Sequence, residues 1–272
     1  MFSDCLLISD FDGTIMYNGT IPENNIEAVK YFIDNGGKFG LATGRHINTI
    51  KPYFDVLSCN VPIIAFNGAA IYDYTTNKTL NIEPLNKSVK ANFKSLQNAF
   101  PNIGIAVHCL NAIYVLNHTK SMDEHLEYVG SPCNLASVED IADKDWLKII
   151  FLIKDKKSRN KIKAFAKDLE MNDCVFTSSH ETIYEMLPKN ANKGEALIKL
   201  AELLSITREN IFSIGDFHND IELIRSAGCG ATVGDAPDEI KQIADYIACP
   251  CKDGALQDFI GHIKLLKIVN QS

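Results

Sequence analysis

The feature that most constrains the fold is a set of short apolar runs, each of which ends abruptly at a polar residue or a glycine. The runs are Cys5–Ser9, Phe39–Ala42, Pro62–Phe66, Ile211–Ile214 and Ala231–Val233. Continuous apolar runs of this length are typical of strands that are buried on both faces of a parallel sheet. Segments with helical spacing separate several of the runs, and this alternation predicts a doubly wound, mainly parallel α/β sheet.

The helical segments are placed by their boundary signals. Thr20–Glu23 has the pattern of a capping box with proline in the first turn, and Gly36–Gly37 marks the end of that helix. A second helix is expected from Asn192, and a third from near Asn219 to Gly228.

The middle of the chain, residues 82–188, has a different pattern. Helical segments at Val89–Phe100 and Ser158–Glu170 alternate with short strand candidates, which are Ile105–Cys109, Ile113–Leu116, Leu147–Ile153, Val175–Ser178 and Ile183–Leu187. We expect an inserted α+β domain that covers a crevice of the core, and we expect the core to consist of residues 1–81 and 189–272.

Composition limits the function classes. The net charge is -7 and the pI about 5.5, which argues against nucleic acid or an anionic membrane as the main partner. No apolar stretch approaches the roughly 20 residues that span a bilayer, and Met1–Asp4 lacks a basic segment. We expect a cytoplasmic monomer or homodimer whose eight cysteines are reduced, without a metal site at Cys249 and Cys251.

Polar residues follow the predicted strands at one edge of the sheet. Asp10, Thr43, Asn67 and Asp216 each stand at or just after the end of an apolar run. Because ligands of open α/β sheets bind outside the carboxyl ends of the strands, we expect these residues around one crevice.

The strongest motif is Asp10-Phe11-Asp12-Gly13-Thr14. Two aspartates just past a buried strand are costly to bury unpaired, and a cation removes that cost. Magnesium fits because it prefers hard oxygen ligands and keeps waters that a phosphate can displace. The alternative is a turn with two solvated aspartates.

A second acidic cluster, Gly215–Asp220, follows a later strand. Its alternative reading is a helix cap, with Asn219 as N-cap and Asp220 favoured by the helix dipole. Capping does not account for Asp216, which stands on the loop, and the cluster therefore indicates metal binding.

Two weaker motifs complete the set. Thr43-Gly44-Arg45 offers a hydroxyl and backbone N–H groups to a phosphate. Lys193, at the start of a helix, can neutralise a phosphate or a nucleophilic carboxylate. The alternative for Lys193 is a solvated surface lysine.

These four segments, in this order, resemble the haloacid dehalogenase superfamily of phosphohydrolases. Asp10–Thr14, Thr43-Gly44, Lys193 and Gly215–Asp220 are similar to its four motifs, and the long insert resembles the Cof-type subgroup with a class IIB α/β cap. The chain departs from that subgroup at Gly234–Ala236, where the family usually has Gly-Asn-Ala, and at the Cys249–Lys252 stretch before Asp253-Gly254. The departures bear on substrate choice more than on reaction type.

The resemblance implies a mechanism. Asp10 would attack phosphorus and form an aspartyl-phosphate, and Asp12 would act as general acid and then base. Magnesium would be held by Asp10, the Asp12 carbonyl and Asp216. Further roles are implied for other residues: Asn219 and Asp220 as outer metal ligands or supports, Lys193, Thr43 and Gly44 on the phosphoryl oxygens, and Arg45, Asn67 and Asn219 on the substrate.

The expected activity is therefore magnesium-dependent hydrolysis of a small phosphorylated metabolite, such as a sugar phosphate or pyridoxal phosphate. An aspartate at position 12 favours phosphoryl transfer over dehalogenation, because a halide leaving group needs no proton. Two alternatives stay open: a phosphomutase of the same superfamily, and a non-catalytic regulator that binds sugar phosphates.

Overall fold

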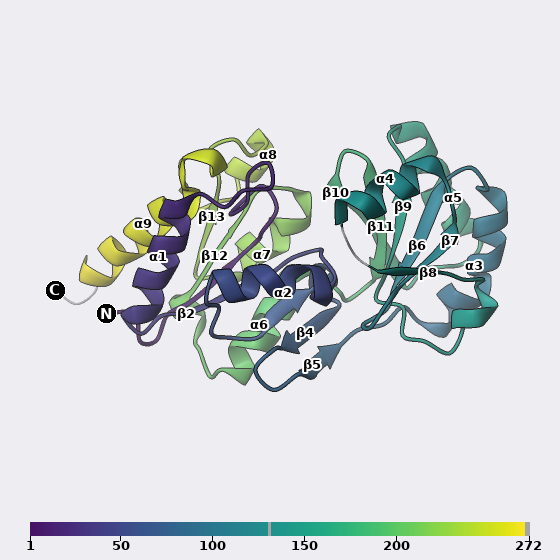
Figure 1. Ribbon diagram of the computed structural model, residues 1–272. Helices are drawn as coiled ribbons and strands as arrows, with labels where there is room; N and C mark the ends of the chain where they lie inside the picture. Colours follow the sequence, from purple (N-terminus) through teal and green to yellow (C-terminus); the bar gives the residue numbers. More distant parts are fainter. Residues whose placement is uncertain (130–131, 270–272) are drawn as a thin grey trace. The chain divides into compact units, whose positions relative to one another are not determined.

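The computed structural model describes residues 1–129 and 132–269 and divides into two compact units. The first contains residues 1–44, 50–81 and 192–272, and the second contains residues 45–49 and 82–191. Figure 1 shows the elements of both units. Residues 270–272 of the predicted core segment lie outside the described residues. The core and cap roles stay predictions.

The first unit is built on a five-stranded sheet with the order β14-β13-β12-β1-β2. Its strands are β1 (Leu6–Ser9), β2 (Lys38–Leu41), β12 (Ile211–Gly215), β13 (Cys229–Thr232) and β14 (Tyr246–Ile247). Every neighbouring pair is parallel. The predicted α/β class with a parallel core sheet is confirmed.

Helices cover both faces of this sheet (Figure 1). Its helices are α1 (Glu23–Asp34), α2 (Ile47–Val56), α6 (Lys193–Leu203), α7 (Ile221–Ser226), α8 (Asp238–Lys241) and α9 (Ala255–Val269). Leu6 and Ile8 of β1 pack with α6 and α7 in one buried cluster. Phe212, whose side chain points to the opposite face of β12 from that of Ile211, meets Phe259 of α9 with ring centroids 6.5 Å apart.

The predicted capping box of the first helix is wrong. The N-cap of α1 is Pro22, and no side chain caps the helix. Thr20 is committed elsewhere, because its N–H and C=O bond with the C=O and N–H of Tyr17 at 3.0 and 2.9 Å. Thr20 therefore closes a small loop before the helix begins.

The apolar run at residues 62–66 does not become a regular strand of the parallel sheet. It forms β3 (Ile63–Ala65) of a three-stranded sheet with β4 (Ala70–Asp73) and β5 (Lys78–Ile82), and β3 pairs antiparallel with β4. A single parallel bridge, from Ala42 to Ile64, links it to the chain after β2. A tight 3₁₀ turn at Phe66–Gly68 then leads the chain directly into β4.

The second unit is a six-stranded sheet with the order β10-β11-β9-β6-β7-β8 and with three α-helices among its described residues. The strands are β6 (Gly104–His108), β7 (Ile113–Asn117), β8 (Cys133–Leu135), β9 (Lys148–Leu152), β10 (Cys174–His180) and β11 (Ile183–Pro188), and the helices are α3 (Lys87–Ala99), α4 (Lys120–Val129) and α5 (Lys156–Asp168). All pairs are antiparallel except β7 with β8. Helix α4 and strand β8 were not predicted: the segment of α4 is largely polar, and β8 is only three residues long and exposed.

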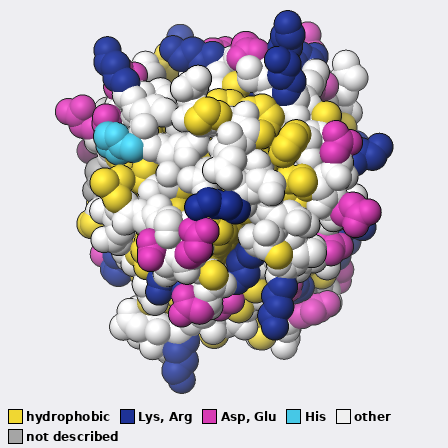
Figure 2. Space-filling model, turned by 90° about the vertical axis from the view of Figure 1, so that its right-hand side faces the viewer, with side chains coloured by type: hydrophobic (Ala, Val, Ile, Leu, Met, Phe, Trp, Pro, Cys, Tyr) yellow, Lys and Arg dark blue, Asp and Glu magenta, His cyan; other side chains and the backbone are white. Residues whose placement is uncertain are grey.

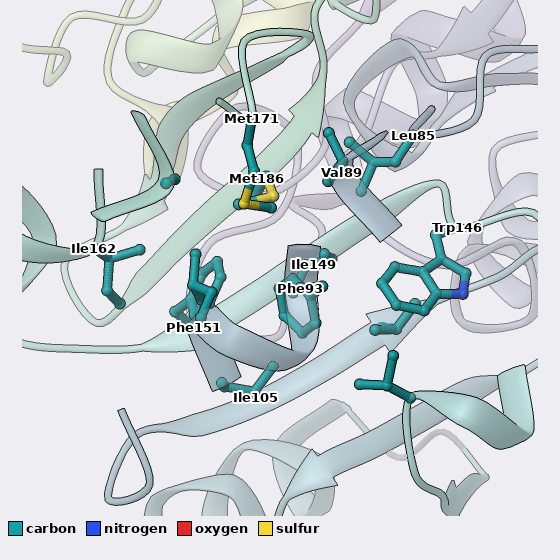
Figure 3. Close-up of a cluster of buried hydrophobic side chains, with 14 of the residues drawn as sticks. Leu85, Val89, Phe93, Ile105, Trp146, Ile149, Phe151, Ile162, Met171 and Met186 are labelled. Atoms are coloured by element: carbon teal, nitrogen blue, oxygen red, sulfur yellow. The ribbon is translucent and has the colours of Figure 1, made fainter. Parts of the chain in front are cut away.

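The core of the second unit lies between its sheet and the helices α3 and α5 (Figure 3). Phe93 of α3 meets Trp146 edge-to-face with centroids 5.5 Å apart. The indole N–H of Trp146 donates to the Ile141 carbonyl at 2.8 Å, so its one polar atom is satisfied in the core. This cluster shares no residue with the buried cluster around β1 and α6 in the first unit.

The surface is mixed in charge. Figure 2 shows basic and acidic side chains interspersed on the face turned to the viewer, with apolar side chains among them. In the part of the chain that the structure describes, no helix has the length and apolar character needed to cross a membrane. All eight cysteines are free thiols, and Cys5, Cys59, Cys109 and Cys251 are buried.

Leu96→Ala should lower the free energy of unfolding of the second unit by about 3–5 kcal/mol, because it opens a cavity where Leu96 is fully buried. Trp146 is the chain's single tryptophan, so its fluorescence during urea unfolding reports on this unit. Leu135→Ala is the matched control, because Leu135 is 73% exposed. Equal midpoints for the two variants would contradict this account of the core.

Candidate active site

The central strands of the first unit bring two acidic segments together. Strands β1 and β12 are parallel neighbours, and the Asp10 N–H continues their ladder by donating to the Ile214 carbonyl at 2.9 Å. Asp10 and Asp216 thus leave the sheet at the same edge, although they lie far apart in sequence. The predicted convergence of these two residues is confirmed.

Lys193 is the first residue of helix α6, which places its side chain at the same edge of the sheet as Asp10. Asn192 is the N-cap of α6, and its side chain accepts the Glu195 N–H at 2.8 Å. The Lys193 ammonium lies 2.5 Å from Asp10 Oδ1 and 2.5 Å from Asp220 Oδ1, and the lysine is fully buried. The alternative of a solvated surface lysine is therefore wrong.

Asp220 closes the acidic loop on itself. Its Oδ2 accepts the N–H groups of Asp216 at 3.0 Å and Phe217 at 3.1 Å, while its Oδ1 receives Lys193. The capping role considered for Asn219 is wrong, because Asn219 lies inside a 3₁₀ turn and α7 begins at Ile221. Asp220 fixes both the loop and the lysine.

Thr14 links the two acidic segments, a role that the sequence analysis did not assign. Its hydroxyl lies 3.2 Å from Asp10 Oδ2 and 3.1 Å from Asp216 Oδ1. One hydroxyl proton serves one carboxylate at a time. The available signal was its place four residues after Asp10 within the first motif.

Gly13 allows this approach. Its φ is +88°, and a Cβ there would lie 2.4 Å from Asp216 Oδ2. Only glycine combines that backbone conformation with the lack of a side chain.

The buried charges perturb one another. Burial, and then the charge of Asp220, raise the pKa of Asp10 to about 7 against the opposing effect of Lys193. Burial and the charge of Asp10 raise the pKa of Asp216 well above its usual value. Burial alone would lower the pKa of Lys193, but the two carboxylates hold it above its usual range. The site is thus short of positive charge.

The donor set fits a divalent cation. Asp10, Asp216 and Asp220 each offer an oxygen, and these oxygens lie within 4.8 Å of one another. If all three carboxylates were ionised beside the one ammonium, two negative charges would be in excess, and burial together with this excess raises the pKa of Asp10 and Asp216. Carboxylate oxygens are the ligands that hard cations prefer. The side chain of Asp12 is exposed and is not part of this cluster.

The remaining predicted site residues divide between the two units. Thr43 is buried, and its N–H donates to the Ile64 carbonyl at 2.8 Å, while the phosphate-binding role of Thr43 and Gly44 stays a prediction. Gly44, Asn67 and Asn219 meet, since Asn219 Nδ2 donates to Asn67 Oδ1 at 3.1 Å and Gly44 packs against the Asn67 amide. Arg45 belongs to the second unit, and its role on the substrate stays a prediction.

The two segments that depart from the family pattern, Gly234–Ala236 and Cys249–Lys252, are joined by a hydrogen bond. Asp235 Oδ1 accepts the Cys251 N–H at 3.1 Å. His218, on the acidic loop, pairs with Glu239 at 2.8 Å. The first contact connects the loops after β13 and β14, and the second connects the loop after β12 to α8.

Comparisons with known proteins agree with this geometry. A family model described as haloacid dehalogenase-like hydrolase matches residues 7–260. The 5-amino-6-(5-phospho-D-ribitylamino)uracil phosphatase YcsE of Bacillus subtilis is 28% identical over 89% of this chain and 88% of its own length. The phosphatase YitU of that organism, with the same substrate in its name, is 22% identical over 94% and 96%.

The fold is also found among solved structures. The HAD subclass IIB sugar phosphatase BT4131 superposes with a TM-score of 0.85 at 19% identity, covering 96% of this chain and 99% of that one. Both the parallel core sheet and the inserted mixed sheet are thus those of a IIB structure.

Gly13→Ala should destabilise the protein by several kcal/mol, because the new methyl group would collide with the Asp216 carboxylate. Gly19→Ala is the matched control: Gly19 has a φ of +80° but nothing within 4 Å of its Cβ position. It should cost about 1 kcal/mol of backbone strain alone. Urea unfolding measures both, and equal losses would show that the Gly13–Asp216 contact has no special importance.

Proposed function

The chain belongs to the haloacid dehalogenase-like hydrolase family, as a Cof-type phosphatase with a class IIB fold, and from this premise we propose that it hydrolyses small phosphate monoesters with Asp10 as nucleophile. One observation carries the proposal: the buried Lys193 ammonium lies 2.5 Å from Asp10 Oδ1. That contact offsets the repulsion between a carboxylate nucleophile and an incoming phosphate dianion.

In the first step, a carboxylate oxygen of Asp10 attacks phosphorus, and the bond from phosphorus to the leaving oxygen breaks. Asp12 gives its proton to that oxygen, which departs as an alcohol. The products are an aspartyl-phosphate and a free sugar or similar alcohol. Splitting the hydrolysis in this way replaces one difficult displacement with two easier ones.

In the second step, Asp12 takes a proton from a water molecule, whose oxygen attacks phosphorus. The bond between phosphorus and Asp10 breaks, phosphate leaves, and both aspartates return to their starting states. The exposed side chain of Asp12 supports this role, because a group that exchanges protons with an alcohol and with water needs access to both.

We propose magnesium as the cation. Asp10, Asp216 and the Asp12 carbonyl would hold it, and it would neutralise charge on the phosphoryl oxygens. Asp220 has both oxygens engaged by Lys193 and by loop N–H groups, so its part is to support the loop. Asn219 would lie beside the ion as an outer ligand.

Thr43, Gly44 and Lys193 would hold the phosphoryl oxygens, and Arg45 and Asn219 the substrate. The names of YcsE and YitU, with that of the sugar phosphatase BT4131, support a phosphorylated sugar or sugar-alcohol derivative as the substrate class. The second unit, as the cap, would select within that class.

Asp10→Asn should reduce kcat for phosphate release by a factor on the order of 10⁴, because the variant lacks the attacking carboxylate. The assay is inorganic phosphate release from a panel of sugar phosphates with Mg²⁺. Asp34→Asn is the control, since Asp34 is exposed and pairs with Lys30. Equal release by the Asp10 variant would exclude this nucleophile, isomerised product without free phosphate would indicate a mutase, and binding without turnover by the wild type would indicate a regulator.

Mg²⁺ should stabilise the wild type by about 2.7 kcal/mol at a free concentration one hundred times its Kd, because it offsets the excess carboxylate charge. A thermal melt with Mg²⁺ or with EDTA measures this shift without any substrate. Asp216→Asn should abolish most of it. A shift of the same size in the variant would remove Asp216 from the metal site.

A further inference from the structure

We propose that Asn67 is a positioning residue, which fixes the amide of Asn219 and the Thr43-Gly44 loop and does not bind the substrate itself. The inference rests on the proposed phosphatase function and revises the substrate contact that the family resemblance implied for Asn67.

The first argument is the backbone. Phe66, Asn67 and Gly68 have φ values of 52°, 56° and 100° in succession. The left-handed region is costly for a bulky residue such as Phe66, and strain of this kind amounts to about 1–3 kcal/mol per residue. Elsewhere in the described residues, non-glycine positive φ values occur singly, at Asn18, Ser58, Asn77, Glu170 and Ser205. A strained pair persists only where its surroundings hold it firmly.

The contacts around Phe66 and Asn67 hold this strained turn in place. The Asn67 N–H donates to the Thr43 carbonyl at 3.0 Å, and the Thr43 N–H donates to the Ile64 carbonyl at 2.8 Å. The Phe66 side chain is fully buried. A Cβ at Gly68 would lie 2.2 Å from the Asn192 carbonyl oxygen, so the turn rests directly on the residue that caps α6.

The second argument is the side chain. Asn67 is 2% exposed, and its Oδ1 accepts from Asn219 Nδ2 at 3.1 Å. A Cβ at Gly44 would lie 3.0 Å from Asn67 Oδ1 and 3.1 Å from its Nδ2, so the amide is packed against the Gly44 backbone. The amide of Asn67 is therefore enclosed between two loops of the site.

The consequence concerns Asn219. An amide has its nitrogen and oxygen on opposite sides, so binding Asn219 Nδ2 to Asn67 determines which way its Oδ1 faces. Asp216 and Lys193 have separate supports in Asp220 and Thr14. Loss of the Asn67 amide should thus leave the acidic cluster intact, keep the backbone bond from residue 67 to the Thr43 carbonyl, and release the Asn219 amide. Losing an outer support of this type typically costs 10–100-fold in activity.

The test is Asn67→Gly, because glycine keeps the left-handed backbone and removes only the amide. Asn77→Gly is the matched control: Asn77 has a φ of 53° and is exposed in the turn between β4 and β5. We expect kcat/KM for phosphate release to fall about 10–100-fold in the first variant and to stay at the wild-type value in the second. Equal activity of the two variants would overturn the proposal, because only backbone conformation would then matter.

Two further measurements separate positioning from substrate contact. If Asn67 acts through Asn219, the double variant Asn67→Gly/Asn219→Ala should be no worse than Asn219→Ala alone, and multiplying losses would overturn the proposal. The loss caused by Asn67→Gly should also be the same for every sugar phosphate of the panel. A loss that depends on the leaving group would make Asn67 a substrate contact.

The two proposals fail in different ways. A wild type that releases no phosphate from any panel member would sink the phosphatase proposal itself. An active wild type with an equally active Asn67→Gly variant would sink only the positioning role. Most of the thermal shift with Mg²⁺ should survive in Asn67→Gly, because Asp10 and Asp216 still bind the ion, and a loss as large as that in Asp216→Asn would contradict positioning, because the acidic cluster would then depend on Asn67.

Discussion

Lys193 places an ammonium group, out of contact with solvent, at 2.5 Å from carboxylate oxygens of both Asp10 and Asp220. Without it, three carboxylates within 4.8 Å of one another would face each other in a medium where unpaired charge is very costly. The fold is arranged to make this contact: β1 delivers Asp10, β12 delivers the loop with Asp220, and the capped start of α6 delivers the lysine. The same contact makes Asp10 usable as a nucleophile, since one cation both stabilises the folded site and prepares it for an anion.

The core strands and the edge of the sheet that carries the site could be predicted from the sequence, because the residue patterns that indicate them are local. Continuous apolar runs marked β1, β2 and β12, and the residues just after them marked the edge where the site lies. The N-cap signal of Asn192 marked the start of α6, and the resemblance to a family motif marked Lys193 as a site residue. The order of the motifs supplied the rest, since it matched a family whose members share the IIB fold.

Some of the misses depend on contacts that are distant in sequence, and others on a local turn. Asn67 and Asn219 are 152 residues apart, and the sequence around neither residue indicates their hydrogen bond. The run at residues 62–66 has the composition of a central strand, but the turn after it sends the chain back as β4. The Thr43 N–H likewise bonds to the Ile64 carbonyl, a partner outside its own motif.

Thr14 has one hydroxyl proton between two acceptors, one from Asp10 and one from Asp216. In the proposed cycle, the Asp10 carboxylate loses its negative charge when it becomes a mixed anhydride with phosphate. The hydroxyl should then rotate toward Asp216, and rotate back after hydrolysis. The orientation of the Thr14 hydroxyl would therefore depend on whether Asp10 is phosphorylated, and only its hydrogen atom would move.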